Sequence, residues 1–405
     1  MNKLSACLIV KNEASVLSRC LESIRTFVDE IVVVDTGSND RTIEIALSYG
    51  ARVYHFTWID DFSAARNESL RYAGGEWILY IDADEVIDAA NAAKIRQVIT
   101  REDIMAVTVQ QCIPQQADNI TTSYYSEYCR IFRQHPDIHF EGAIHEQILP
   151  SIERLGGKVL RSDIVVHHWA YAIDAVKKQK RAERNLRCLL AEIKRVPDDP
   201  FLYLNLGMTY RELGQRDASA KALHRTLSKD GGDMKRELVG QAHLTLAKIY
   251  FEDGNTTKVA YHAQQASVFD PANPLPDYLQ ATLAVNEQQY EKAIRHLESA
   301  IRISKGDGGR LPSVELNMAH VYLELGSCRS AIGDLQGAEE DFLRSLQCNP
   351  SLATPYLLLG NGRFLRGDRK GAREMFERAI AIDPSLDDAR QGLALCHNSE
   401  ELQNS

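Results

Sequence analysis

The chain has 405 residues, of which 44% are apolar, and its formal net charge is −9 at pH 7. This length predicts two or three domains, and the negative balance argues against wholesale binding to nucleic acid or to an anionic membrane. The 8 cysteines include no C-x-x-C pair and are typical of reduced thiols rather than of a disulfide framework or a zinc site. Since no run of about 18 uninterrupted apolar residues occurs, we expect a cytoplasmic protein without a transmembrane segment.

The N-terminal 170 residues alternate short β-type runs with helical stretches, as in an α/β layer fold. Compact apolar strands are expected at Leu4 to Val10, at Ile31 to Val34, at Ala51 to Phe56 and from Trp77. Apolar residues at helical spacing lie between them, in Ala14 to Phe27, Thr42 to Tyr49 and Phe62 to Tyr72. This order predicts a nucleotide-type parallel sheet whose ligand lies at the carboxyl ends of the strands.

Polar residues follow the first two predicted strands. The first strand ends in Val10 to Glu13, and the second runs into Asp35 and a turn that contains Gly37, Ser38 and Asp40. Both ends lie at the same edge of a parallel sheet. A carboxylate at the position of Asp35 suits a hydrogen bond from the ring N–H of a base or from ribose. Gly37 permits a tight turn before Ser38 or Asp40 caps the next helix.

The fourth strand stops abruptly in the acidic sequence Asp82-Ala83-Asp84-Glu85. Crowded carboxylates repel one another. A hard divalent cation relieves this repulsion when one or two carboxylates share its coordination sphere with the phosphates of a substrate. The alternative is a solvated turn in which Asp82 or Asp84 caps the following helix. The other motifs of the first 90 residues favour a metal-phosphate site.

Taken together, these motifs resemble a family 2 glycosyltransferase of the GT-A type. The segments that carry the resemblance occur in the family's order and are Val10 to Glu13, Val34 to Thr42, Ala65 to Asn67 and Ala73 to Glu85. The resemblance covers roughly residues 4 to 90 closely and extends more loosely to about residue 170. It implies an α/β GT-A-type nucleotide-sugar-binding domain and a nucleotide-diphospho-sugar donor, commonly a UDP-sugar.

The resemblance also implies roles for individual residues. It places Asp35 at the base, Asp82 near the ribose and Asp84 on a divalent cation, Mn2+ or Mg2+, which neutralises the charge on the departing diphosphate. The other donor-binding residues that it implies are Val10, Asn12, Glu13, Arg66, Asn67 and Ala83. For Arg66 and Asn67 the alternative is an exposed helix face, which these two residues would favour if taken alone.

Direct transfer needs a base that deprotonates the acceptor. The stretch from Tyr128 to Arg133, followed by Phe140 to Glu146, resembles the acceptor-side segment of a bacterial branch of the family, in which the acid after the histidine is the candidate base. Glu146 is therefore the first choice and Glu141 the reserve. His145 either orients the base or is a histidine of the core. The chain lacks the E-D dipeptide on which many inverting members place their base.

A second metal ligand is expected at the end of the last strand of the α/β region, in Val165 to Trp169. Imidazole suits Mn2+ better than Mg2+, and His168 is the residue chosen. Adjacent residues of a strand face opposite sides, so His167 and His168 cannot both bind one ion. The alternative is that both histidines are structural.

After residue 170 the strand signal ends, and an internal repeat appears in helical sequence. Five positions recur at an interval of 34 residues: Gly326 and Gly360, Gly333 and Gly367, Ala338 and Ala372, Phe342 and Phe376, and Pro350 and Pro384. This period resembles the tetratricopeptide repeat. Weaker copies align on Gly207, Ala247 and Ala281, and Val176 to Val196 is a basic amphipathic helix.

The domains predicted from these patterns are a GT-A domain at 1–171, a helical linker at 172–198, an all-α solenoid of about five repeats at 199–395 and a tail at 396–405. We expect a metal-dependent transfer, with inversion, of a hexose or N-acetylhexosamine from a nucleotide sugar. Repeat arrays leave a concave groove, often for a peptide. The groove is thus expected to recruit a peptide or protein acceptor, or a protein partner. A lipid-linked or polysaccharide acceptor is the next choice.

Two rival functions use the same domains. In the first, the repeats form a scaffold and the nucleotide-sugar domain is inactive, but the intact acids Asp35, Asp82 and Asp84 argue against decay. The second is nucleotidyl transfer onto a sugar phosphate, which wants a glycine-rich, lysine-containing loop after the first strand. Lys11 to Ala14 offers no such glycine.

Overall fold

The computed structural model describes residues 3–114, 120–169, 175–228, 234–306 and 312–401. The chain divides into two compact units. The first contains Met1–Gln116 and Ser123–Ala242, and the second contains Ala117–Thr122 and His243–Ser405. The α/β domain therefore shares a unit with the first helices of the C-terminal half.

The α/β domain is built on four parallel strands in the order β3-β2-β1-β4. They are β1 (Leu4–Val10), β2 (Glu30–Asp35), β3 (Arg52–His55) and β4 (Trp77–Tyr80). Alternate residues of β1 enter two separate cores, with Leu8 in one and Cys7 in the other. Because both faces are covered, the strands are apolar along their whole length, as the sequence predicts.

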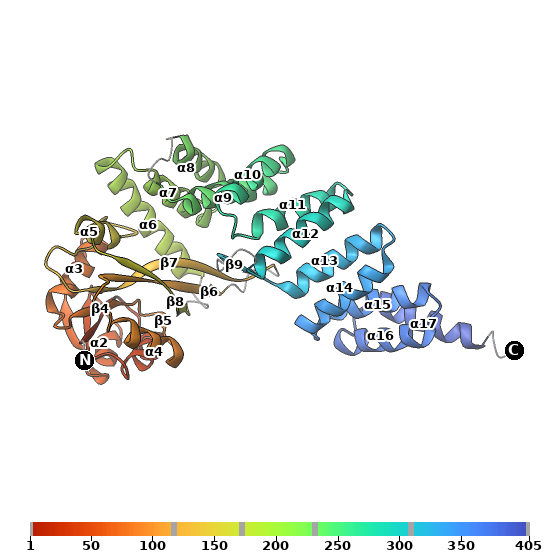
Figure 1. Ribbon diagram of the computed structural model, residues 1–405, viewed down its shortest axis with the longest axis horizontal. Helices are drawn as coiled ribbons and strands as arrows, with labels where there is room; N and C mark the ends of the chain where they lie inside the picture. Colours follow the sequence, from red (N-terminus) through yellow and green to blue (C-terminus); the bar gives the residue numbers. More distant parts are fainter. Residues whose placement is uncertain (1–2, 115–119, 170–174, 229–233, 307–311, 402–405) are drawn as a thin grey trace. The chain divides into compact units, whose positions relative to one another are not determined.

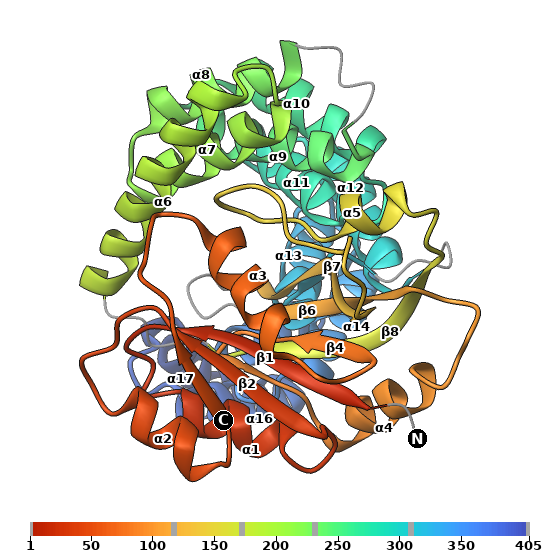
Figure 2. The ribbon, with the colours of Figure 1, turned by 90° about the vertical axis from the view of Figure 1, so that its left-hand side faces the viewer.

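Five helices cover the two faces of this sheet (Figure 2). Residues of α1 (Leu17–Ile24), α2 (Thr42–Ser48) and α4 (Ala89–Val98) lie in the same core as Leu8. Residues of α3 (Phe62–Tyr72) and α5 (Leu149–Arg154) lie in the core of the opposite face. The helix predicted from Ala14 begins only at Leu17, because the amides of Val16 and Leu17 first close a turn on the carbonyl of Glu13.

The sheet continues beyond β4 in the order β7-β6-β8-β5. These strands are β7 (Thr121–Arg133), β6 (Ala106–Pro114), β8 (Val159–His168) and β5 (Glu85–Val86). β7 runs antiparallel to β4, and β5 runs antiparallel to β8 with Glu85 opposite His168. The end of the last strand is therefore carried back to the acidic turn that follows β4.

In the part of the chain that the structure describes, the first unit continues with α6 (Ala175–Arg195), α7 (Pro200–Glu212) and α8 (Arg216–Ser228) and ends inside the helix that follows them (Figure 1). α6 agrees with the basic helix predicted at Val176 to Val196. Its Leu189 is buried together with Leu202 and Leu206 of α7 and with Ile144 of the α/β domain. Apart from residues 172–174, which lie outside the described residues, most of the predicted linker is thus a packed helix that joins the first repeat to the α/β domain.

The remaining helices follow the repeat predicted from the sequence. They are α9 (Arg236–Glu252), within which the two units divide, α10 (Thr256–Phe269), α11 (Leu275–Asn286), α12 (Tyr290–Ser304), α13 (Met318–Ala331), α14 (Leu335–Cys348), α15 (Ala353–Leu365), α16 (Arg369–Ile382) and α17 (Asp387–Glu401). A Cβ atom added at Gly326 would lie 2.7 Å from the Phe342 ring, and one at Gly360 would lie 2.6 Å from the Phe376 ring. The recurring glycines therefore mark the places where the paired helices touch.

One expectation for the C-terminal half, that it contains no strand, is wrong. A short strand, β9 (Val314–Leu316), pairs with the start of β7, and the amide of Asn317 donates to the carbonyl of Ile120 at 2.6 Å. Three residues are too few to show a strand period, and their partner is distant in the sequence. The tail predicted from residue 396 is helical as far as Glu401, the last residue that the structure describes.

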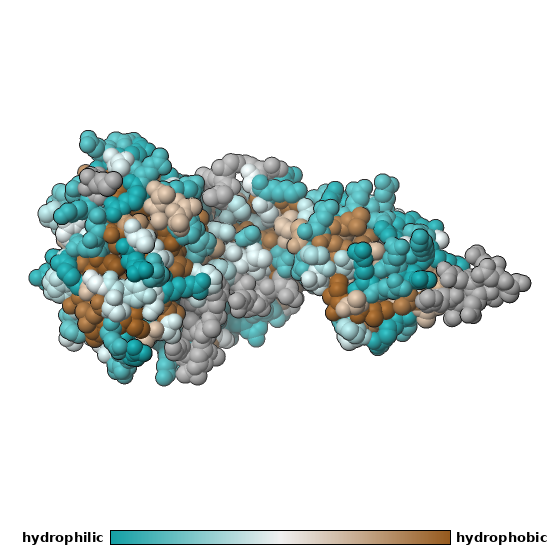
Figure 3. All heavy atoms as spheres, turned by 90° about the horizontal axis from the view of Figure 1, so that it is seen from below, coloured by the Kyte–Doolittle hydropathy of each residue, from teal (hydrophilic) through white to brown (hydrophobic). Residues whose placement is uncertain are grey.

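The surface of the second unit carries scattered exposed apolar side chains: Tyr261, Val268, Ile332, Leu343, Leu365, Ile382 and Leu395. On the face drawn in Figure 3, apolar residues lie between hydrophilic ones. Scattered apolar residues of this kind are ordinary on protein surfaces. Among the described residues, no helix combines the length and the apolar character that crossing a membrane requires.

Candidate functional site

The ends of β1 and β2 are tied together at one edge of the sheet. The amide and the hydroxyl of Thr36 both donate to the carbonyl of Val10, at 2.9 and 3.1 Å. The amide of Asn12 donates to Ser38 Oγ at 2.9 Å, and Asn12 Oδ1 accepts from the amide of Asn39 at 2.8 Å. Asn12 has a φ of 58°, a left-handed conformation that asparagine tolerates better than most residues. The two motifs thus form one structure, as their positions in the sequence predict.

Asp35 is 2% exposed and holds its own turn. Its carboxylate accepts from the amides of Gly37 at 3.0 Å and Ser38 at 3.1 Å. Gly37 has a φ of 105°, which favours glycine. His55 Nδ1 lies 3.7 Å from the same carboxylate. The turn therefore fixes Asp35 at the edge of the sheet, and its contact with a base stays a prediction.

Contrary to the prediction, neither Ser38 nor Asp40 is the N-cap residue of α2, because that position is Arg41, which makes no side-chain capping bond. Asp40 instead holds the backbone next to it. Asp40 accepts from the amide of Thr42 at 3.0 Å and from the amide of Ala14 at 3.2 Å. The hydroxyl of Thr42 in turn accepts from the amide of Glu13 at 2.8 Å. Asp40 and Glu13 therefore have different roles. The carboxylate of Asp40 accepts hydrogen bonds from backbone amides, whereas Glu13 is fixed by the hydrogen bond that its own amide donates to Thr42.

The three acids after β4 do not share one environment. Glu85 is fully buried and accepts from Arg130 Nη2 at 2.6 Å, from the amide of Asp82 at 2.8 Å and from Gln111 Nε2. Burial raises the pKa of Glu85 above its usual range, although Arg130 opposes this. Glu85 therefore anchors the turn in the core and is not one of the carboxylates that face a ligand.

Asp82 lies between two arginines. Its carboxylate accepts from Arg66 Nη2 at 2.7 Å and from Arg130 Nη2 at 3.2 Å. Burial alone would raise the pKa of Asp82, but the two guanidinium groups hold it well below the usual range. Both guanidinium groups also lie over the ring of Tyr80, at 4.7 Å for Arg66 and 4.3 Å for Arg130. The two arginines thus favour the ionised form of Asp82 and compensate its negative charge.

Asp84 faces outward and meets the predicted second ligand. Its Oδ2 lies 3.2 Å from His168 Nε2, and the side chains are 25% and 19% exposed. Burial opposes a charged imidazole, yet the neighbouring Asp84 raises the pKa of His168. His167 turns to the other side, where its Nε2 lies 3.5 Å from Asp88. The antiparallel pairing of β5 with β8 thus brings together the two residues expected to bind a metal.

The donor set of Asp84 and His168 suits a cation that is shared with a substrate. The described part of the chain contains no group of three or more His, Cys, Asp or Glu residues able to hold a metal ion. Magnesium is usually bound through one or two carboxylates plus substrate phosphates and waters rather than by an all-protein cage. Imidazole adds affinity for Mn2+. These two side chains therefore fit such a cation.

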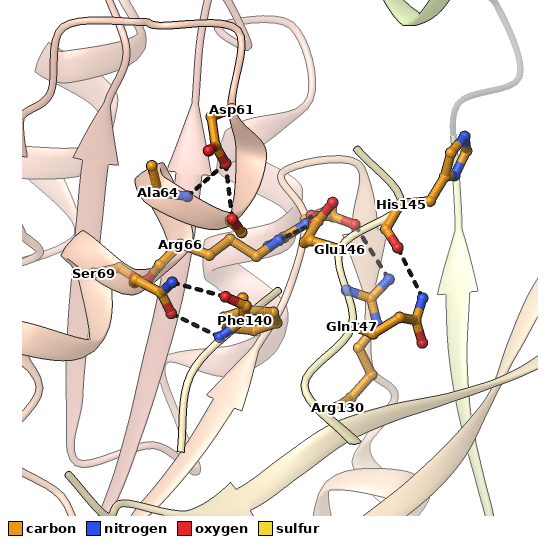
Figure 4. Close-up of polar contacts among 12 residues, drawn as sticks. Asp61, Ala64, Arg66, Ser69, Arg130, Phe140, His145, Glu146 and Gln147 are labelled. Carbon is orange, nitrogen blue, oxygen red and sulfur yellow. Dashed lines mark hydrogen bonds and ion pairs between the residues drawn. The ribbon is translucent and has the colours of Figure 1, made fainter. Parts of the chain in front are cut away.

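Arg66 joins the acidic turn to the predicted base (Figure 4). Its Nη2 donates to Asp82 and its Nε donates to Glu146, whose side chain is 12% exposed. Burial by itself would disfavour the charged guanidinium, but Asp82 and Glu146 raise the pKa of Arg66 above its usual range. The alternative of an exposed helix face is wrong for Arg66, which is 7% exposed.

The predicted base lies in a closed loop, residues 141–147, which we call the Glu146 loop. The amides of Glu141 and Gln147 each donate to the other's carbonyl, at 3.0 and 2.9 Å. Asn67 holds the start of the loop, because its Nδ2 donates to the carbonyl of Phe140 at 2.9 Å while its Oδ1 accepts from the Phe140 amide at 2.8 Å. Asn67 therefore positions this loop, and a contact with the nucleotide stays a prediction.

The other two acceptor-side candidates lie apart from Arg66. His145 has a φ of 53°, and its imidazole points away from Glu146 (Figure 4) to meet the ring of Phe201 edge-on at 6.5 Å. Glu141 pairs with Arg154, and His139 Nε2 lies 3.2 Å away. Of the three residues predicted for acceptor chemistry, Glu146 is thus the one that Arg66 joins to the acidic turn.

The sequence reasoning missed Arg130, Gln111 and Tyr80 as parts of this cluster. Arg130 reaches the turn because β7 runs antiparallel to β4, with Ile131 opposite Leu79. Its Nε is buried without a hydrogen-bond partner among the described residues. The available signal was an arginine within a strand that is otherwise apolar at Cys129, Ile131 and Phe132. A buried arginine of this kind requires a carboxylate partner.

Two family models match parts of the chain. Residues 5–169 match the family model described as Glycosyl transferase family 2, and residues 202–225 match a tetratricopeptide repeat model. Among solved structures, YrrB, described as a TPR protein with an unusual peptide-binding site, is 18% identical with a TM-score of 0.42. That alignment covers 50% of this chain and 96% of YrrB.

Curated relatives match about half of the chain. A TPR repeat-containing protein of Synechococcus elongatus is 35% identical over 235 residues, which cover 56% of this chain and 57% of that protein. The glycosyltransferase SunS of Bacillus subtilis is 27% identical over 218 residues, which cover 53% of this chain and 50% of SunS. The chain thus spans about half the length of these relatives.

Proposed function

We propose that this chain, whose residues 5–169 form a glycosyl transferase family 2 domain followed by tetratricopeptide-type helices, is a metal-dependent glycosyltransferase. The observation that carries the proposal is the joining of Asp82 to Glu146 through Arg66, next to the turn in which Asp84 meets His168. Residues expected on the donor side and on the acceptor side thus belong to one cluster.

The donor is a nucleotide-diphospho-sugar, UDP-hexose or UDP-N-acetylhexosamine. Asp35 takes the base and Asp82 the ribose. β1 lies between the two strands that these residues follow, so the strand ends are separated by two strand spacings, about 10 Å. A nucleoside fits a span of this size. The other donor-side residues are Val10, Asn12, Glu13, Arg66 and Ala83.

Asp84 and His168 would hold the divalent cation, Mn2+ or Mg2+, that the transfer requires. When bound, the cation neutralises negative charge that develops on the departing diphosphate. The protein prepares the position by burying Glu85, whose bonds to Arg130 and to the amide of Asp82 fix the turn. Asp84 is left on the outer side of the same turn.

Glu146 takes the proton of the acceptor nucleophile. The acceptor atom forms a bond to the anomeric carbon while the bond from that carbon to the diphosphate oxygen breaks, and the diphosphate leaves with the electron pair. One displacement of this kind inverts the anomeric centre. Arg66 orients the carboxylate, since its Nε bonds to Glu146 while its Nη2 is held by Asp82. A peptide or protein is the acceptor that the adjoining helices favour.

Calorimetric titration with UDP in the presence and absence of Mn2+ tests the donor site. We expect UDP to bind tightly only with the metal, and Asp84→Ala to remove the gain that the metal brings. Asp163→Ala is a matched control, because Asp163 is an exposed acid of β8 that pairs with Lys94. If no UDP-sugar or other nucleotide binds to the wild-type protein, the chain is a repeat scaffold instead.

The base is tested separately by transfer to acceptor in Glu146→Gln. We expect the amide to lower kcat by about 100-fold or more, in the range of general base catalysis, with UDP affinity retained. Glu141→Gln tests the reserve base in the same assay, and we expect it to keep kcat because Glu141 pairs with Arg154 rather than with Arg66. A Glu146→Gln variant that transfers sugar at the wild-type rate would place the base elsewhere.

A further inference from the structure

The first half of α6 concentrates positive charge in a chain that is negative overall. Residues 178–187 contain five cations and one acid, Glu183, whereas the net charge of the whole chain is −9. Arg181, Arg184 and Arg187 follow one another at three-residue spacing, so they are neighbours along one side of the helix. We call the five cations the α6 row: Lys178, Lys180, Arg181, Arg184 and Arg187.

Among the described residues, no member of the α6 row forms an ion pair with a carboxylate, although the nearby Asp60 acts against the burial that lowers the pKa of Arg184. Glu183 accepts from Gln179 at 2.9 Å. Arg195, at the end of the same helix, pairs with Glu192 at 2.9 Å. Burial and then the neighbouring Arg181 and Arg187 lower the pKa of Arg184. Like charges at this spacing destabilise a helix, so the row is a surface that an anion would stabilise.

The row lies beside the elements that hold the predicted base. Arg184 Cζ is 4.8 Å from the centre of the Phe62 ring, and the amide of Phe62 donates to the carbonyl of Ala143 in the Glu146 loop at 2.8 Å. Phe62 also begins α3, one turn before Arg66. Figure 2 shows α6 passing next to the segment that leads into α3. The α6 row is thus connected, through Phe62, to the Glu146 loop on the acceptor side of the cluster.

Aromatic and apolar side chains adjoin the row at this end. Trp58 meets the Phe62 ring edge-on at 4.7 Å, and Ile59, between them in the sequence, is 61% exposed. Two residues after Ala143 in the sequence, the ring of His145 contacts the ring of Phe201 edge-on. Cations next to aromatic side chains suit a polypeptide that has both acidic and apolar residues.

We propose that the α6 row binds an acidic segment of a polypeptide acceptor and so brings a neighbouring residue of that polypeptide to Glu146. This role rests on the proposed function. Charge complementarity supports an anionic occupant, and the position of Arg184 beside Phe62 supports an occupant on the acceptor side. An anionic membrane fits less well, because the apolar face of α6, with Cys188 and Leu189, is buried against α7 and cannot insert.

Fluorescence anisotropy with a labelled acidic peptide tests this surface. A peptide of about ten residues that alternates Asp or Glu with Ser and aromatic residues is compared with its amidated Asn and Gln counterpart. We expect the acidic peptide to bind and the amidated peptide not to bind. The affinity for the acidic peptide should fall as the salt concentration is raised from about 0.05 to about 0.5 M. Arg181→Glu with Arg187→Glu is expected to weaken binding about tenfold or more, and lysine at both positions to retain most of it.

The control for overall charge is Lys292→Glu with Arg295→Glu. These two cations lie on α12 in the second unit, and changing both to glutamate alters the net charge by the same amount as the α6 double variant. We expect this control to bind the acidic peptide like wild type. Equal binding by the two double variants, or equal binding of the acidic and amidated peptides, contradicts the proposal. Circular dichroism of each variant establishes that it is folded.

Parallel titrations separate this proposal from the proposed function. If the acidic peptide binds through the α6 row while UDP with Mn2+ does not bind, the docking surface stands and the donor site fails. If UDP binds and displaces the peptide, the row belongs to the donor site and the acceptor role is wrong. If vesicles of phosphatidylglycerol bind through the row and the peptide does not, the surface recognises lipid and the proposal is overturned.

Discussion

The helix pair α7 and α8 and the helix pair α15 and α16 have the same repeat geometry but pack against different parts of the molecule. In the first unit, α7 packs on α8 where Gly207 approaches Leu223, and in the second unit α15 packs on α16 where Gly360 approaches Phe376. The buried residues of the core around α15 and α16 all lie in the repeat helices. The core around α7 and α8 also takes in Ile144 of the Glu146 loop. The first repeat therefore supports the candidate site, whereas the last supports only its neighbouring helices.

The largest expected difference between the two pairs comes from Ile144→Ala. Ile144 is 4% exposed, and its loss leaves a cavity that destabilises the first unit by about 2 to 4 kcal/mol. The Glu146 loop then loses its anchor on α6 and α7. Since small misplacements of reacting groups cost about 100-fold in rate, we expect kcat for transfer to fall by that order. Steady-state kinetics and thermal unfolding measure the two effects.

Leu359→Ala is the matched change in the second unit. Leu359 lies on α15 and is 2% exposed. We expect its replacement by alanine to lower the free energy of unfolding by a similar amount, about 2 to 4 kcal/mol. We expect transfer activity at temperatures below unfolding to remain at the wild-type level. Equal losses of kcat in the two variants would show that the first repeat has no special link to the site.

Alanine at the helix contacts sharpens the same comparison. A Cβ atom at Gly207 would lie 2.6 Å from Leu223, and one at Gly360 would lie 2.6 Å from Phe376. Overpacking of this kind costs about 1 to 3 kcal/mol in either pair. We expect Gly207→Ala to lower kcat as well, because α7 shifts against Ile144, and Gly360→Ala to leave kcat unchanged. Serine at the same positions should follow the same order.

A smaller effect is expected from Phe201→Ala, which removes the edge-on contact of α7 with His145. Such aromatic pairs contribute about 0.5 to 1.5 kcal/mol, and the Glu146 loop keeps its other anchor at Ile144. We expect kcat to fall several-fold with little change in UDP affinity. Unaltered kcat in Phe201→Ala, together with a large loss in Ile144→Ala, would assign the support of the loop to the aliphatic contact alone.

The smallest expected effect is common to both pairs. Gly214 and Gly367 end helices with φ values of 71° and 84°, and nothing lies within 4 Å of a Cβ atom added at either. Alanine at each site should therefore cost only the strain of the left-handed conformation, about 1 kcal/mol. Chemical denaturation should give equal losses for Gly214→Ala and Gly367→Ala. Unequal losses would mean that the two repeats differ in their local geometry as well as in their surroundings.

The sequence predicted most of the parallel sheet and the repeats correctly. β1 and α3 have the predicted bounds, Leu4–Val10 and Phe62–Tyr72, because β1 is a continuous apolar run that ends in polar residues and α3 has its apolar residues at helical spacing. The glycines of the repeat were found because close helix contacts leave no room for a Cβ atom. β9 was missed because three residues contain no period and its partner strand is distant in the sequence.

The candidate site was predicted unevenly. Asp84 and His168 were chosen as one pair, and the structure brings them together through the register of β5 with β8. Glu85 was grouped with the other acids, yet it is buried on Arg130. The direction in which each acid of the turn faces depends on its partners from β6 and β7. The spacing of residues along the sequence contains no information about these partners.

The amino-acid sequence by itself determined the residues at the ends of strands and the faces of helices, because the periods of strands and helices are local properties of the chain. Only the tertiary structure decided which of those residues pair. Arg66 meets Asp82 and Glu146 across intervals of 16 and 80 residues. Buried charges must find opposite charges wherever the fold brings them, and that choice depends on antiparallel registers and on the packing of α6 and α7 against the Glu146 loop.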